Sequence, residues 1–107
     1  MDLTQKVCVA CEGDVAPLNS IEATVLLKQI PGWAVDSGAK ILSREFTVKN
    51  FAEALAFVNK IGVIAESEGH HPDISFGWGR VAVNLTTHAI KGLSENDFIV
   101  AAKINQI

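Results

Sequence analysis

Residues 50–69 read NFAEALAFVNKIGVIAESEG and predict one long amphipathic helix, around which the rest of the fold is arranged. Asn50 and Glu53 match a capping box, in which the amide oxygen accepts a hydrogen bond from the backbone three residues on and the carboxylate reaches back. Gly69 is expected to end the helix, because glycine adopts the left-handed C-cap conformation at little cost. The apolar residues recur at helical spacing: Phe51, Ala54, Leu55, Val58, Ile61 and Ala65.

A predicted β-hairpin lies on either side of this helix. Residues 33–35 and 40–48 are expected to pair around the turn-forming residues 36–39. After the helix, residues 74–78 and 81–87 form the second predicted hairpin, which turns near Gly79 and Arg80. Alternation predicts one packed face on the longer strands. The residues expected on the packed faces are Leu42, Phe46, Val48, Val81, Val83, Leu85 and Thr87.

A shorter helix is predicted to begin after Asn19 and Ser20, with Glu22 in its first turn, where a carboxylate favours the positive end of the helix dipole. The Pro31-Gly32 pair is expected to stop it, because proline cannot continue the hydrogen-bond ladder. The expected apolar stripe consists of Ile21, Val25, Leu26, Leu27 and Ile30.

A last helix is predicted to open at Ser94, with Asp97 three residues later. The element order is therefore helix, strand, strand, helix, strand, strand, helix, which predicts an α+β fold with helices stacked on an antiparallel sheet. Residues 1–18 show no clear period and are expected to form a mobile or loosely docked arm. Residues 19–107 are expected to form a single domain.

Length and composition indicate one folded domain and narrow its partners. The chain has 107 residues, 49% of them apolar and 20% charged, which is typical of a globular domain. A formal net charge of −3 argues against binding a nucleic-acid backbone. No apolar stretch approaches the roughly 20 residues of a membrane span, and the start does not resemble a signal peptide. We expect a cytoplasmic protein that does not bind membranes.

The two cysteines form a C-x-x-C pair, Cys8 and Cys11. Such a pair can be redox-active or supply half of a zinc site. A flanking βαβ pattern and a second C-x-x-C pair are both missing, so we expect a short N-terminal lead whose thiols stay reduced. A zinc site completed by two histidines remains the alternative.

The three histidines, His70, His71 and His88, are the main candidates for chemistry. Imidazole exchanges protons near neutral pH and is the usual general acid or base, although a lone histidine is more often structural. His70 and His71 leave the long helix just before Pro72, and successive side chains in an extended segment diverge, so different tasks are expected of them. His88 is expected at a strand end, before a loop. A metal site is the rival, but the His-x-x-x-His spacing is missing, and no metal is expected.

Three further side chains could support these histidines. Glu66 precedes His70 by one helical turn, where it could fix the imidazole tautomer. The alternative is an exposed pair worth a few tenths of a kcal/mol. Trp33 and Trp78 could each offer a stacking surface for an aromatic heterocycle, and core packing is expected of one of them.

Taken together, these motifs resemble the signature of the pterin-4a-carbinolamine dehydratase family. The resemblance rests on residues 66–72 (ESEGHHP), Trp78, residues 86–88 (TTH), residues 92–94 (GLS) and Asp97, and weaker similarity extends over most of the chain outside the arm. The fold that it implies is a four-stranded antiparallel sheet with three helices packed on one face. This agrees with the α-β-β-α-β-β-α order above.

The resemblance implies dehydration of 4a-hydroxytetrahydropterin, the carbinolamine left by an aromatic amino-acid hydroxylase, to quinonoid dihydropterin. Pterin is then the substrate, and neither a metal nor a cofactor is needed. Family members form homodimers or homotetramers, and a functional link to a hydroxylase is implied. The alternative is a non-catalytic binding module, either a dimerisation cofactor for a transcription factor or an assembly factor for an enzyme. The natural tetrahydropterin and the choice between dimer and tetramer stay open.

Residue roles follow from the resemblance by motif position. His70 and His88 are implied as the acid–base pair, and His71 as a residue that positions the pterin ring. Glu66 would orient a histidine, and Asp97 would do the same or only cap the last helix. One of the two tryptophans would wall the pocket.

Overall fold

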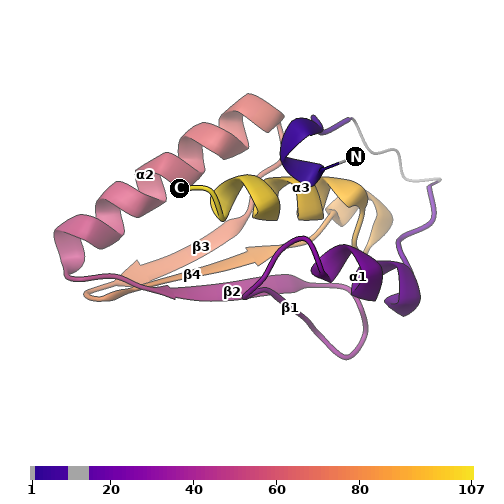
Figure 1. Cartoon of the computed structure of the whole chain (residues 1–107), viewed down its shortest axis with the longest axis horizontal. Helices are drawn as coiled ribbons and strands as arrows, with labels where there is room; N and C mark the ends of the chain where they lie inside the picture. Colours follow the sequence, from indigo (N-terminus) through magenta and orange to yellow (C-terminus); the bar gives the residue numbers. More distant parts are fainter. Residues whose placement is uncertain (1, 10–14) are drawn as a thin grey trace.

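Four antiparallel strands form a single sheet in the spatial order β1-β2-β4-β3. In this computed structural model, which describes residues 2–9 and 15–107, the strands are β1 (Ala34–Val35), β2 (Leu42–Thr47), β3 (Asp73–Gly77) and β4 (Arg80–Leu85). The helices α1 (Ser20–Leu27), α2 (Phe51–Glu68) and α3 (Glu95–Ile104) lie on one side of the sheet (Figure 1). The predicted α+β class and element order are confirmed.

The core lies between the sheet and α3. The packed face of β4 consists of Val81, Val83 and Leu85, all fully buried, as the alternation predicts. Phe98 on α3 is fully buried in the same apolar cluster. The second hairpin turns one residue earlier than predicted, at Trp78 and Gly79.

The ends of α2 follow from local chemistry. The Asn50 side chain accepts a hydrogen bond from the Glu53 backbone N–H, whereas the Glu53 carboxylate reaches back to Lys49, so the predicted capping box forms in one direction only. Gly69 ends the helix in the left-handed conformation, with φ of 65°. The backbone N–H of the next residue, His70, also donates to the Ala65 carbonyl. This bond fixes the direction in which the chain leaves the helix.

Helix α1 has the predicted capping box but only part of the predicted buried stripe, because Ile30 lies in the core and Leu26 and Leu27 pack against it. The Asn19 and Glu22 side chains each accept a hydrogen bond from the other residue's backbone. Ile21 and Val25, however, are mostly exposed, and Ala23 is the buried residue of this helix. The small Ala23 side chain allows a close approach to the core, and tertiary packing overrides the weak apolar pattern of an eight-residue helix.

The expectation of a mobile or loosely docked arm is wrong for residues 2–9. Leu3 is 1% exposed and belongs to the core, and its backbone N–H donates to the side chain of Gln29. Asp2 caps a short 3₁₀ helix, Leu3–Gln5, by accepting hydrogen bonds from Thr4. Cys11 lies outside the described residues. Among the residues that are described, no helix has both the length and the apolar character needed to cross a membrane.

Candidate active site

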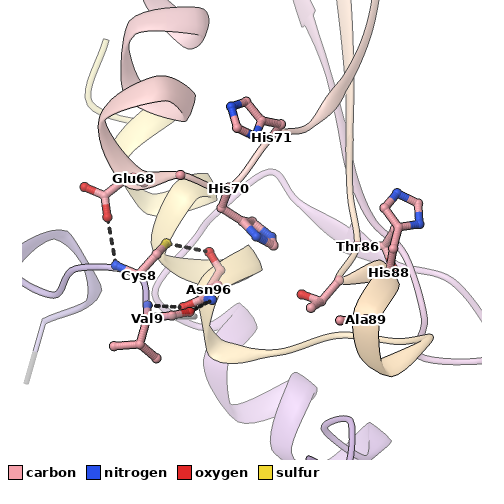
Figure 2. Close-up of a pocket in the computed structure, with 11 residues that line it drawn as sticks. Cys8, Val9, Glu68, His70, His71, Thr86, His88, Ala89 and Asn96 are labelled. Atoms are coloured by element: carbon pink, nitrogen blue, oxygen red, sulfur yellow. Dashed lines mark hydrogen bonds between the residues drawn. The ribbon is translucent and has the colours of Figure 1, made fainter. Parts of the chain in front are cut away.

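The three histidines line one pocket of about 510 Å³ (Figure 2). This volume falls in the range of roughly 300–1,000 Å³ that small-molecule sites occupy. His70 and His71 follow α2, and His88 follows β4 together with Thr86, Thr87 and Ala89. The remaining lining residues come from the arm and the facing helix ends: Cys8, Val9, Glu68, Gly69 and Asn96. Segments that are distant in the sequence therefore meet around one hollow.

His70 is held by the buried carboxylate of Asp97. Its Nε2 lies 2.6 Å from Asp97 Oδ1, and the Asp97 side chain is fully buried. Because an ionised carboxylate only accepts hydrogen bonds, the His70 Nε2–H donates, and in a neutral imidazole Nδ1 is the nitrogen that can accept a proton. The two residues are 27 positions apart, so only the tertiary structure brings them together.

Asp97 also accepts two hydrogen bonds on its other oxygen. Oδ2 lies 2.7 Å from Thr87 Oγ1, which donates, and 3.0 Å from the backbone nitrogen of Ser94. Thr87 Oγ1 in turn lies 2.7 Å from Ser94 Oγ. Asp97 therefore caps α3, as its spacing from Ser94 predicts, and binds a pocket histidine at the same time. The Thr87 hydroxyl and the Ser94 backbone N–H fix the orientation of the carboxylate that faces His70.

Glu66 has a different partner from the one that the helical spacing predicts. Its Oε2 lies 2.5 Å from Nε2 of His71, not of His70, and both side chains are mostly exposed. The chain leaves the helix at Gly69, so His70 does not continue the helical register and turns toward Asp97 instead. An exposed ion pair of this kind contributes little to stability.

The prediction that His88 ends a strand is wrong. β4 ends at Leu85, and His88 begins a 3₁₀ helix, His88–Ile90. Its side chain is exposed at the pocket rim. In Figure 2 it lies across the pocket from the arm, with His70 between them. A short loop anchored by the bonds between Thr87 and Gly92 therefore presents this imidazole to solvent and to the pocket.

Neither tryptophan lines the histidine pocket. Trp33 is almost fully buried, donates its Nε1–H to Asn105 Oδ1 and packs edge-on against Phe46. Trp78 lies at the β3–β4 turn, at the opposite end of β3 from the histidines, and is 74% exposed. Within one chain, the prediction that a tryptophan walls the pocket is therefore wrong.

The described residues contain no group of three or more His, Cys, Asp or Glu side chains arranged to hold a metal ion. Cys8 borders the pocket, with Sγ 3.6 Å from the backbone oxygen of Asn96. Burial, and then the charge of Glu68, raise the pKa of the Cys8 thiol from 9.0 to about 12. Cys8 is therefore a protonated thiol near neutral pH, and a protonated thiol is a poor nucleophile.

This raised pKa predicts slow alkylation of Cys8. At pH 8 the shift lowers the thiolate fraction about a thousandfold, and the greater nucleophilicity of a high-pKa thiolate offsets only part of this. In a Cys11→Ser variant, iodoacetamide should modify Cys8 at least tenfold more slowly in the folded chain than in urea, as followed by mass spectrometry. Equal rates would contradict the protected thiol.

Sequence reasoning missed the contribution of the arm to this site. Cys8 and Val9 contact Glu68 and Asn96, which are 60 and 87 residues further along the chain. The one local signal was Asp2, whose position two residues before Thr4 is that of a helix cap. It could have predicted a short ordered turn at the start, but not where that turn docks.

The fold and the pocket together define a class of protein, a small α+β domain that presents imidazoles to a pocket of small-molecule size. The chain belongs to the pterin-4a-carbinolamine dehydratase family. The family model described as pterin 4 alpha carbinolamine dehydratase matches residues 16–107. This confirms the resemblance carried by the histidine motifs, and it leaves the arm residues 2–9 outside the matched part.

Relatives and solved structures agree with this family. A protein of Halorhodospira halophila is 48% identical over 107 residues, covering all of this chain and 98% of the relative, and one of Methylococcus capsulatus is 49% identical over 105 residues, covering 98% and 92%. Both are provisionally named pterin-4-alpha-carbinolamine dehydratase.

Two solved structures share the fold. A transcriptional coactivator/pterin dehydratase from Brucella melitensis superposes with a TM-score of 0.79 at 32% identity, over 84% of this chain and 96% of that one. A pterin dehydratase-like protein, identified as a RuBisCO assembly factor in the alpha-carboxysome, superposes with a TM-score of 0.61 at 25% identity, over 70% and 87%. The second neighbour is named for assembly, so the fold by itself does not imply catalysis.

Proposed function

We propose that the chain catalyses the dehydration of 4a-hydroxytetrahydropterin to quinonoid dihydropterin, with histidines as general acid and base. The observation that carries this proposal is the single pocket lined by His70, His71 and His88, in which His70 is paired with a buried carboxylate. A binding module has no physical need for such a pair, whereas proton transfer depends on it.

The reaction needs two proton transfers. The ring nitrogen next to C4a donates its electron pair to form a C=N bond, the C4a–O bond breaks, and the nitrogen loses its proton. One imidazole accepts that proton, and a second, protonated imidazole gives a proton to the departing hydroxide, which leaves as water. Exchange with solvent then resets both rings. Each transfer typically contributes roughly 10²–10⁴-fold to the rate.

We assign the base to His70 and the acid to His88. The Asp97 carboxylate keeps the proton of a neutral His70 on Nε2, leaves Nδ1 to accept, and stabilises the imidazolium that forms. His88 is exposed at the rim, where it can exchange protons with water and recharge after each turnover. His71, oriented by Glu66, positions the pterin ring.

The proposal extends to the setting of the enzyme. Pterin is the substrate, and loss of water from a carbinolamine is neither a redox nor a metal-dependent step, so no cofactor is needed. The carbinolamine would come from an aromatic amino-acid hydroxylase. We also propose that the protein acts in the cytoplasm and forms a homodimer or homotetramer. Self-association is supported by the apolar surface that Phe51, Leu55 and Val63 leave exposed on α2.

A stopped-flow assay tests the activity. The purified chain should accelerate the loss of carbinolamine absorbance at neutral pH well above the spontaneous rate, and a chelator should leave the acceleration unchanged. The control is Asn84→Ala, which alters an exposed β4 side chain that does not line the histidine pocket. A chain that leaves the spontaneous rate unchanged would reject catalysis and favour the binding-module alternative.

A further inference from the structure

Residues 2–9 of the arm are docked on the domain, and they lie outside the residues matched by the family model. Leu3 anchors the arm in the core, and Lys6 forms a salt bridge with Glu95 at the start of α3, with 2.8 Å between Nζ and Oε2. After this anchor the chain runs along the pocket, where Cys8 and Val9 contribute to the lining. The roles proposed for the histidines do not involve this segment.

Cys8 and Val9 of the arm are hydrogen-bonded to two different helices, α2 and α3. The Cys8 backbone N–H donates to Glu68 Oε1 at 2.8 Å. The Val9 backbone N–H donates to Asn96 Oδ1 at 3.1 Å, and the Val9 carbonyl accepts from Asn96 Nδ2 at 2.6 Å. Figure 2 shows the arm crossing from Glu68 to Asn96 beside His70, with the Val9 side chain directed away from the histidines.

The two partners of the arm, Glu68 and Asn96, each lie next to the His70–Asp97 pair in the sequence. Glu68 is the last residue of α2, two residues before His70, and Asn96 directly precedes Asp97. The arm therefore spans the same gap that the His70–Asp97 hydrogen bond spans. Lys103 also binds Glu68, at 2.6 Å, but from the last turn of α3, whereas the arm ties α2 to the first turn, where Asp97 lies.

We propose that Cys8 and Val9 form a brace that positions the His70–Asp97 pair by holding the end of α2 against the start of α3. This inference rests on the proposed function for its catalytic consequence. Proton transfer depends steeply on geometry, and a displacement of about 1 Å can cost 10²-fold in rate. The brace acts through the backbone of Cys8 and Val9, so these are positioning residues and not catalytic ones.

Proline substitution tests the brace without touching the core. Val9→Pro removes the N–H that donates to Asn96, and the Val9 side chain is 70% exposed. Val7→Pro is the matched control, because Val7 is 68% exposed, does not line the pocket, and its N–H makes no hydrogen bond to the described residues. Val9→Ala keeps the N–H and should keep the hydrogen bond between His70 and Asp97.

Two readouts are measured on each variant. The first is the proton NMR resonance of the His70 Nε2–H, assigned with His70→Gln, which reports the hydrogen bond to Asp97 independently of activity. The second is kcat and KM for the carbinolamine. Val9→Pro should broaden or abolish the resonance and lower kcat at least fivefold, with KM changed less than threefold. Val7→Pro and Val9→Ala should both retain the resonance, and Val7→Pro should stay within twofold of wild-type kcat.

The outcomes separate this proposal from the proposed function. A sharp resonance and wild-type kcat in Val9→Pro would overturn the brace while leaving the dehydratase intact. A wild-type chain without turnover, whose resonance still depends on Val9, would overturn the dehydratase and support the brace as a structural element. A lost resonance with unchanged kcat would overturn the catalytic consequence. Asn96→Ala, which removes both partners of Val9, provides a second release variant and should match Val9→Pro in both readouts.

Discussion

His88→Ala is expected to lower kcat for carbinolamine dehydration by roughly 10²–10⁴-fold, the usual contribution of a general acid. His88 is exposed at the rim of the pocket, so its removal leaves no cavity in the core, and the free energy of unfolding should change by less than about 0.5 kcal/mol. Stopped-flow absorbance gives the rate, and urea unfolding gives the stability. Loss of activity without loss of stability is the signature of a side chain that acts on the substrate.

Two controls sharpen this expectation. Asn84→Ala, at an exposed position on β4, should keep wild-type turnover. Added imidazole should restore part of the activity of His88→Ala, because an exposed site can admit a free ring that supplies the missing proton. Turnover of His88→Ala within threefold of wild type would overturn the assignment of His88 as the acid.

Asp97→Asn is expected to reduce kcat at least a hundredfold by reversing the tautomer of His70. The Ser94 backbone N–H can only donate, so the new amide oxygen must face it, and the amide NH₂ then faces His70 Nε2. Nε2 must now accept, which moves the imidazole proton to Nδ1 and removes the lone pair assigned to the base. The same substitution beside the catalytic histidine of serine proteases costs about 10⁴-fold.

The comparison of Asp97→Asn with Asp97→Ala separates chemistry from stability. Asp97→Ala leaves three donors without an acceptor in a buried site, and its free energy of unfolding should fall by about 3–5 kcal/mol. Asp97→Asn keeps the side-chain volume and one acceptor, so it should lose less stability but comparable activity. An Asp97→Asn variant with wild-type kcat would show that the tautomer of His70 does not matter to the reaction.

Local patterns predicted the elements of this chain because helix caps, turns and alternation act over a few residues. Asn50 and Gly69 bound α2 as expected, and the spacing of Ser94 and Asp97 correctly placed the start of α3. The same reasoning failed where the environment decides orientation. Ile21 belongs to an apolar pattern, yet it faces solvent, because a short helix packs through whichever side fits the core.

The amino-acid sequence by itself determined the element order and the α+β class, and it singled out the three histidines as candidates for chemistry, since these depend on local pattern and on side-chain identity. Only the tertiary structure decided which carboxylate meets which imidazole, that Trp33 packs in the core instead of the pocket, and that the arm joins Glu68 to Asn96. Except for the pair formed by Glu66 and His71, those contacts link residues that are 27 to 87 positions distant in the sequence. No local rule selects such partners, because they are fixed by how the helices and the sheet pack together.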